Sequence, residues 1–369
     1  SGAINSSAAD MAKLVHFLLL RGATPSAPIV SASAIDRMET PCTTLGAAVG
    51  VEAGYGLANF TSGYRNFNRA FHGHNGGMMG ALAELTYSKE LGQGFVIMIN
   101  SSNGAAMGRI SELLRGYILR DASVETPPAR PLPPQFRELD GYYKPLNHRV
   151  QMLAFMLNLV SVLEITSDET SFHRHPLFGG WTSNDYAADE HTLIDAWHGL
   201  PAIAIVEDPL AGTALQVGSE LWKRVPAWRV FVPLGVPLLV VAMTLIGFIA
   251  LLVWCYRRFA AKTSQDRRLW MRLWPLISTG LLFMLVMMIV SIGAMLQYVG
   301  TISPVSIGIL LLSLAYPATV LFGVFELARH KNRTQKNLPY WCAAVFAVAH
   351  LSIVAYLASY GLIGIRTWA

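Results

Sequence analysis

Two histidines and four glycines meet in one short segment, Phe71-His72-Gly73-His74-Asn75-Gly76-Gly77-Met78-Met79-Gly80. Glycine lets a strand approach a ligand closely and leaves backbone N–H groups accessible. Such N–H groups can stabilise an oxyanion, and a neighbouring histidine can donate a hydrogen bond or move a proton near neutral pH. The segment is therefore a candidate functional site, and a glycine-rich turn with two surface histidines is the alternative interpretation.

The elements that would position this segment are predicted from apolar spacing. Ser7 is a predicted N-cap with Asp10 three residues later, and an apolar helical face follows as far as Gly22. Strands are predicted at residues 83–87 and 95–100, and a second helix at residues 105–119. Helix, hairpin and helix in this order indicate an α+β arrangement for residues 1–123.

Three pieces of this region occur in the order seen in β-lactamase-related serine hydrolases, the family of class C β-lactamases, penicillin-binding DD-peptidases, D-aminopeptidases and related esterases. They are Ser7-Ala8-Ala9-Asp10-Met11-Ala12, His74-Asn75-Gly76-Gly77 and Val96-Ile97-Met98-Ile99-Asn100-Ser101. Residues 1–123 thus resemble the C-terminal half of that catalytic domain. The resemblance implies that His74, Asn75 and Gly76 form the family's third motif, with His74 facing the nucleophile and the substrate. It also implies that the N–H of Gly77 supplies half of an oxyanion hole.

The chain departs from the family at its other two motifs, Ser-x-x-Lys and Tyr-x-Asn. No Ser-x-x-Lys occurs in the sequence, and Thr86-Tyr87-Ser88-Lys89 has only a related spacing at the end of a strand. Tyr64-Arg65-Asn66 spells the second motif, but it lies on the wrong side of the first helix, so we interpret it as coincidence. A base without its nucleophile loses most of the catalysis. We expect this chain to be inactive alone and to be the C-terminal portion of a longer protein.

A proline-rich linker is predicted at residues 124–134, and it separates this region from residues 135–226. The second region holds short β-type runs between turn residues, which indicates a small antiparallel β-sheet or barrel. Residues 139–143 and 221–226 resemble the two ends of a lipocalin-like appendage that follows some members of the family. Residues 151–160 are apolar and are compatible with either a strand pair or a helix.

Membrane spans are predicted in the last part of the chain, residues 227–369. Hydrophobic residues make up 53% of the sequence and charged residues only 14%, whereas soluble proteins carry about 25% charge. Four long apolar blocks, in which Glu326 at the end of the third is the one charged residue, are long enough to cross a bilayer, at about residues 230–255, 273–298, 303–326 and 339–364. Three spans or a re-entrant segment is the alternative.

Basic residues fix the predicted orientation of these spans. Six follow the first span and four follow the third, whereas the turn between the second and third spans is uncharged. The positive-inside rule places both basic loops in the cytoplasm of a bacterial cell. The soluble regions then lie on the periplasmic or extracellular side of the inner membrane. These ten residues also explain the net charge of +5, so no nucleic-acid partner is expected.

No metal or other cofactor is expected. His72 with His74, and His173 with His175, have a spacing that can bind metal, but no cysteine or carboxylate cluster accompanies either pair. His350 lies inside the fourth span, where an ionisable residue raises a functional hypothesis. A neutral histidine packed against a neighbouring helix is the simpler interpretation. The three cysteines do not indicate a disulfide framework.

Two functions of different classes remain open at this level. The first is a membrane-anchored serine hydrolase that acts outside the cytoplasmic membrane on small peptide, amide or ester substrates. The second is a non-catalytic relative that binds or senses a ligand, and a transporter is a weaker third reading. In each case the lipid bilayer is a partner. The sequence predicts neither the particular substrate nor the oligomeric state.

Overall fold

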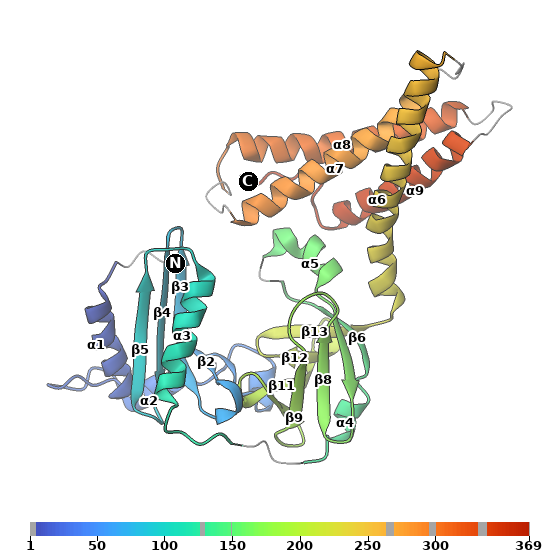
Figure 1. Ribbon diagram of the computed structural model, residues 1–369. Helices are drawn as coiled ribbons and strands as arrows, with labels where there is room; N and C mark the ends of the chain where they lie inside the picture. The colour runs from blue at the N-terminus through green and yellow to red at the C-terminus, as the bar shows by residue number, and fades with distance from the viewer. Residues whose placement is uncertain are drawn as a thin grey trace. The chain divides into compact units, whose positions relative to one another are not determined.

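The computed structural model describes residues 5–125, 130–148, 150–262, 269–294, 300–330 and 338–368 (Figure 1). Part of the predicted linker, residues 126–129, lies outside them, as do residues 263–268, 295–299 and 331–337 of the membrane region. The chain forms two compact units. One comprises Ser1–Asn147 and Ser161–Val225, and the other comprises His148–Val160 and Pro226–Ala369.

The first module of the first unit is a five-stranded antiparallel sheet with helices. The N-cap prediction is confirmed, because the Asp10 N–H donates to Ser7 Oγ over 3.1 Å. The strands follow one another in chain order across the sheet. The elements are α1 (Ala8–Leu19), α2 (Ala32–Glu39), β1 (Gly54–Tyr55), β2 (Phe60–Ser62), β3 (Phe71–Met78), β4 (Ala81–Ser88), β5 (Gln93–Ile99) and α3 (Gly104–Ile118).

Helices α1 and α3 cover opposite faces of this sheet, as Figure 1 shows. Alternate residues of a strand point to opposite faces, so each face has its own apolar set. Tyr87 of β4 packs with Val15 and Leu18 of α1. Phe71 of β3 packs with Ile118 of α3 on the other face. The predicted α+β class is thereby confirmed, with the glycine-rich segment forming a strand and its turn.

The second module is a closed eight-stranded antiparallel barrel. Eight strands leave an interior that side chains can fill. Here Ile165, Phe172, Leu193 and Ile203 are fully buried in it, and Phe136 of the short helix α4 (Pro134–Arg137) joins them. The strands are β6 (Gly141–Pro145), β7 (Leu163–Ser167), β8 (Ser171–Pro176), β9 (Ser183–Ala187), β10 (Thr192–Asp195), β11 (Leu200–Asp208), β12 (Gly212–Val217) and β13 (Glu220–Val225).

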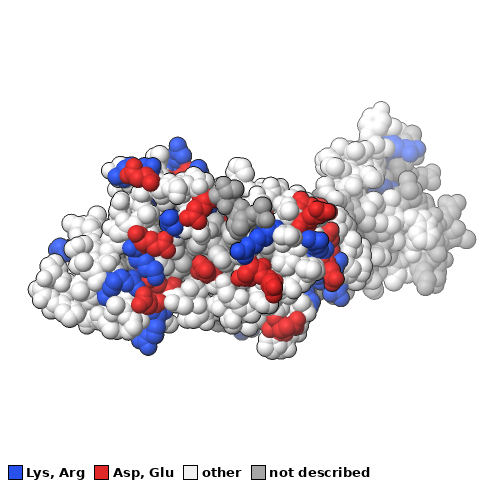
Figure 2. Space-filling model, turned by 90° about the horizontal axis from the view of Figure 1, so that it is seen from below, with Lys and Arg blue, Asp and Glu red and all other residues white. Residues whose placement is uncertain are grey.

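The barrel is joined to the first module by close backbone contacts. The N–H of Arg65 donates to the carbonyl of Trp197 over 2.6 Å, and a Cβ on Gly63 would lie 1.7 Å from the carbonyl oxygen of His198. A second contact is buried: the N–H of Gly46 donates to Oε1 of Gln216 over 2.7 Å. Figure 2 shows Lys and Arg interspersed with Asp and Glu on one face of the molecule.

The membrane unit holds four apolar helices that are long enough to cross a bilayer, counted over the described residues. The chain is therefore a multi-pass membrane protein. Residues 151–160, for which the sequence left two options, form a 3₁₀ turn, η3 (Gln151–Leu153), and a helix, α5 (Ala154–Val160). The long helices are α6 (Trp228–Cys255), followed by the π-helical turn η4 (Tyr256–Ala260), α7 (Trp270–Ala294), α8 (Pro304–His330) and α9 (Leu338–Ser359).

A chain of polar contacts joins one residue from each long helix. The hydroxyls of Thr244 and Thr279 lie 3.1 Å apart, and Thr279 Oγ1 lies 3.3 Å from Nε2 of His350. The hydroxyl of Tyr316 lies 3.0 Å from the other ring nitrogen of His350. His350 is fully buried within the unit. The predicted packing of this histidine against neighbouring helices is what the structure shows.

Candidate functional site

Strand β3 is buried in its first half and exposed in its second. Phe71, His72 and Gly73 are buried, whereas the strand is exposed from His74 to Met78. Strand β2 pairs only with the first three residues, and β4 pairs along the whole strand. One edge of β3 therefore extends beyond β2 from His74 onward. All four predicted site residues, His74 to Gly77, lie on this stretch.

The N–H of Gly77 points toward this extended edge. In an antiparallel ladder, successive residues direct their N–H and C=O groups to opposite edges. The N–H of Gly73 is directed to the β2 side, where it donates to Oδ1 of Asn59 over 2.6 Å. The β3–β4 register runs without a bulge from His72 to Met78. Alternation therefore directs the N–H groups of Asn75 and Gly77 to the same side, away from β4.

The His74 ring has two polar contacts that define its protonation pattern. Nδ1 contacts the carbonyl of Asn75, and a carbonyl can only accept, so Nδ1 carries the proton. Nε2 lies 3.2 Å from the hydroxyl of Tyr55 and, in the neutral ring, accepts from it. Tyr55, in β1, was not singled out by the sequence, because only the pairing of β1, β2 and β3 brings it to His74.

The four site residues do not share one face of the sheet. Alternation places His74 and Gly76 on the face covered by α1, and Asn75 and Gly77 on the face covered by α3. The same strand thus presents the side chain of His74 on one face of the sheet and the backbone N–H of Gly77 at the sheet edge. A ligand carbonyl lying along the edge could accept a hydrogen bond from the N–H of Gly77.

A buried polar network fixes the start of β3. The amide of Asn59 accepts from the N–H of Gly73 and donates to the hydroxyl of Tyr87 over 2.9 Å. That hydroxyl donates to Glu39 over 2.9 Å. Gly73 has φ +151°, and a Cβ there would lie 2.0 Å from the carbonyl oxygen of Leu85. The network therefore holds the residue just before His74, at a position that only glycine can occupy.

Glu39 is the charged centre of this network and is only 2% exposed. Burial raises the pKa of its carboxyl, but hydrogen bonds from Arg21, Tyr87 and Lys89 outweigh burial and leave that pKa below its usual value. Burial also raises the pKa of the Tyr87 hydroxyl, so it stays protonated as the donor. A buried carboxylate with such partners is costly to disturb.

His72 is held neutral beside Glu39. The Thr61 hydroxyl donates its proton to the Glu39 carbonyl over 2.7 Å, so its 2.9 Å contact with Nδ1 of His72 must use the proton on that nitrogen. Burial lowers the pKa of His72 to about 4. Of the two histidines in the segment, His72 is thus a structural residue, and His74 is the one exposed to a ligand.

The remaining sequence candidates lie elsewhere. Tyr64 packs with Phe67 near α3, away from the face of β3 that carries His74. His173 lies 3.0 Å from Asp168 and 2.8 Å from Asn184 on the barrel. Over the part of the chain that the structure describes, three or more His, Cys, Asp or Glu side chains do not gather into a metal site.

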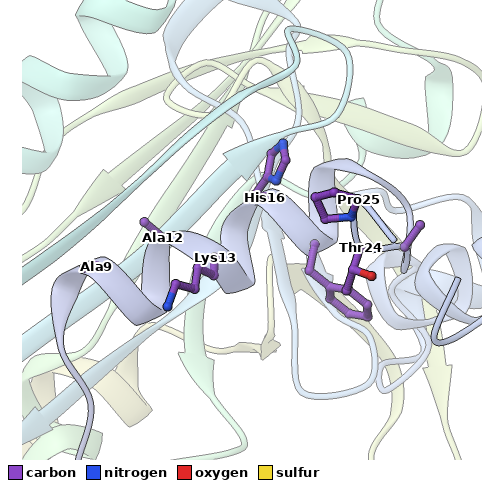
Figure 3. Close-up of a pocket in the computed structure, with 8 residues that line it drawn as sticks. Ala9, Ala12, Lys13, His16, Thr24 and Pro25 are labelled. Carbon is purple, nitrogen blue, oxygen red and sulfur yellow. The ribbon is translucent and has the colours of Figure 1, made fainter. Parts of the chain in front are cut away.

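An open groove of about 490 Å³ lies along α1 (Figure 3). It is formed by one face of the helix and the loop that follows it, and its surface is mainly apolar. Lys13 and His16 lie on the helix side, while Thr24 and Pro25 lie on the loop side. His74 is not among the lining residues, so the groove is separate from the β3 edge.

Fold and site together define a multi-pass membrane protein with an α+β module and an eight-stranded barrel. No family model and no curated protein matches the chain. Solved structures that resemble it include SurE (17% identity, TM-score 0.32, 60% of this chain and 48% of that one) and SurE with D-Leu (19%, 0.28, 53% and 44%). Another is the octameric penicillin-binding protein homologue from Pyrococcus abyssi (18%, 0.23, 59% and 47%). The chain spans about half the length of each.

Proposed function

We propose that this chain is the C-terminal portion of a membrane-anchored, β-lactamase-related serine hydrolase that acts outside the cytoplasmic membrane. Its substrates are small peptides, amides or esters. The observation that carries the proposal is the edge of β3, where His74 and the N–H of Gly77 are both available beyond the end of β2. An acyl group whose carbonyl lies along this edge would find one backbone donor, the N–H of Gly77, with the exposed ring of His74 on the same strand.

In the proposed chemistry this chain supplies an oxyanion donor and a histidine, and residues that it does not contain supply the nucleophile and the base. A backbone N–H aimed at a developing oxyanion typically contributes about 3 kcal/mol of transition-state stabilisation. The nucleophile and its base must come from Ser-x-x-Lys and Tyr-x-Asn, neither of which this chain supplies in the family's order. His74, with Nε2 toward Tyr55, serves as an electrostatic and hydrogen-bonding partner rather than as the base.

This division is tested by comparing two purified proteins on a panel of peptide, amide and ester substrates. One is the product of the whole reading frame, which should encode Ser-x-x-Lys and then Tyr-x-Asn upstream of Ser1. The other is the chain of residues 1–369. We expect turnover by the first and none by the second. Equal turnover by residues 1–369 would show that the site lies elsewhere, and an upstream frame without both motifs would remove the basis of the proposal.

A further inference from the structure

Helix α5 and the turn before it form an apolar segment in the connection between two strands of the barrel. Residues Gln151–Val160 are inserted between β6 and β7, which are neighbouring strands of the barrel. The segment contains no charged residue, and its only polar side chains are those of Gln151 and Asn158. A helix that is apolar on all sides is normally buried in protein or in lipid.

Protein covers this segment only in part, because one of its ten residues is buried and most of the others are half-buried. Phe155 is 5% exposed and packs into the core of the membrane unit with Met152 and Met156. The hydroxyl of Tyr356, near the end of α9, donates to the carbonyl of Phe155 over 2.6 Å. Leu157 is half-buried and Val160 is 40% exposed, and neither belongs to that core. An apolar surface is therefore left next to the bundle.

The segment is attached to one end of the four-helix bundle. The core cluster that contains Phe155 also contains Ile289 toward the end of α7, Ile309 near the start of α8 and Leu357 near the end of α9. The opposite ends of these helices carry the basic side chains, for example Arg329 in the last turn of α8. Ten helical residues extend about 15 Å, half of the roughly 30 Å hydrocarbon thickness, so the segment is too short to cross the bilayer.

We propose that residues 151–160 lie in the bilayer at the end of the bundle remote from the basic loops, with Leu157 and Val160 against lipid acyl chains. The occupant of this surface is lipid, because the surface continues that of four helices whose outward residues are themselves apolar and exposed, such as Leu238 and Val348. The barrel would then be anchored through its β6–β7 connection as well as through α6. This inference does not depend on the proposed hydrolase activity.

Site-specific fluorescence quenching tests it in proteoliposomes. The native cysteines, Cys42, Cys255 and Cys342, are replaced by serine, and single cysteines at Leu157 or Val160 are labelled with bimane. Leu210→Cys is the matched control, because Leu210 is a 99% exposed leucine in the β11–β12 turn. The liposomes contain phosphatidylcholine with either ordinary or brominated acyl chains.

Brominated lipid should quench at least one of the two α5 probes by twofold or more and leave the Leu210 probe unchanged. A water-soluble maleimide should also react at least tenfold more slowly at the quenched position than at Leu210. If neither α5 probe is quenched beyond the control, the segment is not in contact with lipid and the inference is overturned. Two positions are used because they lie one turn apart on the side of the helix opposite Phe155, so the result does not depend on one labelling site.

Discussion

His74 and His72 lie two residues apart on one strand but have opposite environments. The ring of His74 is exposed and contacts Tyr55, whereas His72 is buried beside Glu39 and kept neutral. We therefore assign ligand binding to His74 and strand positioning to His72. Each assignment predicts a different response to substitution or to pH.

Replacing His74 should impair turnover without unfolding the protein. In the full-length protein, His74→Ala should lower kcat/KM about 100-fold, because a hydrogen-bonding and electrostatic partner of the reacting group is lost. His173→Ala, on the surface of the barrel, is the matched control and should retain activity. Unfolding temperatures of both variants should stay within a few degrees of the parent. Parental activity in His74→Ala would show that the third motif has been placed wrongly.

Acidification should destabilise the unit that contains the sheet and the barrel through His72. The pKa of its ring is about 4 in the folded protein against 6.5 for the ordinary side chain, so below pH 6.5 the unfolded chain binds a proton that the folded protein does not. This contribution to the free energy of unfolding is complete above pH 6.5. It is lost as the pH falls toward 4, and the loss reaches about 3 kcal/mol. Glu39, whose pKa is also lowered, adds a loss in the same direction at still lower pH.

The measurement is the free energy of unfolding between pH 7 and pH 4.5, for the parent and for His72→Gln. The variant cannot take up the proton, so its stability should depend less steeply on pH in this range. The same pH slope in both proteins would mean that His72 is accessible to protons in the folded state.

At the scale of elements, the contact between the barrel and the first module depends on glycine. Gly63→Ala places a methyl group 1.7 Å from the His198 carbonyl oxygen, so the two backbones must separate. We expect a loss of about 2–3 kcal/mol in stability. The matched control is Gly116→Ala in α3, which meets nothing within 4 Å and should gain up to about 1 kcal/mol. Chemical denaturation measures both, and equal stability of the two variants would contradict this contact.

The contacts of His350 should stabilise the helix bundle. His350→Ala removes a buried ring that joins Thr279 and Tyr316. We expect the free energy of unfolding to fall by about 2 kcal/mol. Intramembrane hydrogen bonds average about 0.6 kcal/mol each, and the loss of packing adds to them. Ser352→Ala, in the same helix but exposed, is the control and should change little. Unfolding in mixed detergent micelles tests this. Unchanged stability of His350→Ala would leave the polar chain without a structural role.

Elements with a strong local signal could be predicted from the sequence. Helix α1 was predicted from its Ser7 cap and its apolar spacing. Helix α3 and the β4–β5 hairpin were also predicted from spacing and turn residues, because residues close in the sequence determine these elements. The long apolar helices overlap the predicted spans for the same reason. The predicted uncharged third span ends near Glu326, whereas α8 continues for about one further turn to His330.

Features that depend on distant pairing could not be predicted. Closure of the barrel requires β13 to pair with β6, two strands separated by most of that module. The contact of Tyr55 with His74, and the links from Glu39 through Tyr87 and Asn59 to Gly73, arise only when the sheet assembles. The apolar segment at 151–160 was ambiguous because its period suits either a strand or a short helix, and packing against the bundle selects the helix.

For the whole molecule, the positive-inside rule predicts which side of the membrane each helix end occupies. Alkaline phosphatase fused after the C-terminus should be active, because that end is expected outside the cytoplasm. The same enzyme fused after Ala260, at the end of η4, should be inactive, and a fluorescent protein there should fold. The reverse pattern would place the soluble modules in the cytoplasm and remove an external substrate.

The central claim is that the β3 edge belongs to an externally exposed serine hydrolase. A membrane-impermeant fluorophosphonate probe, applied to right-side-out spheroplasts that express the full-length protein, tests both parts of it. We predict labelling of the intact protein that disappears when the serine of the upstream Ser-x-x-Lys is replaced by alanine and slows at least tenfold in His74→Ala. Absence of labelling in folded full-length protein, or labelling that survives the serine replacement, would contradict the account and favour a ligand-binding or sensor protein.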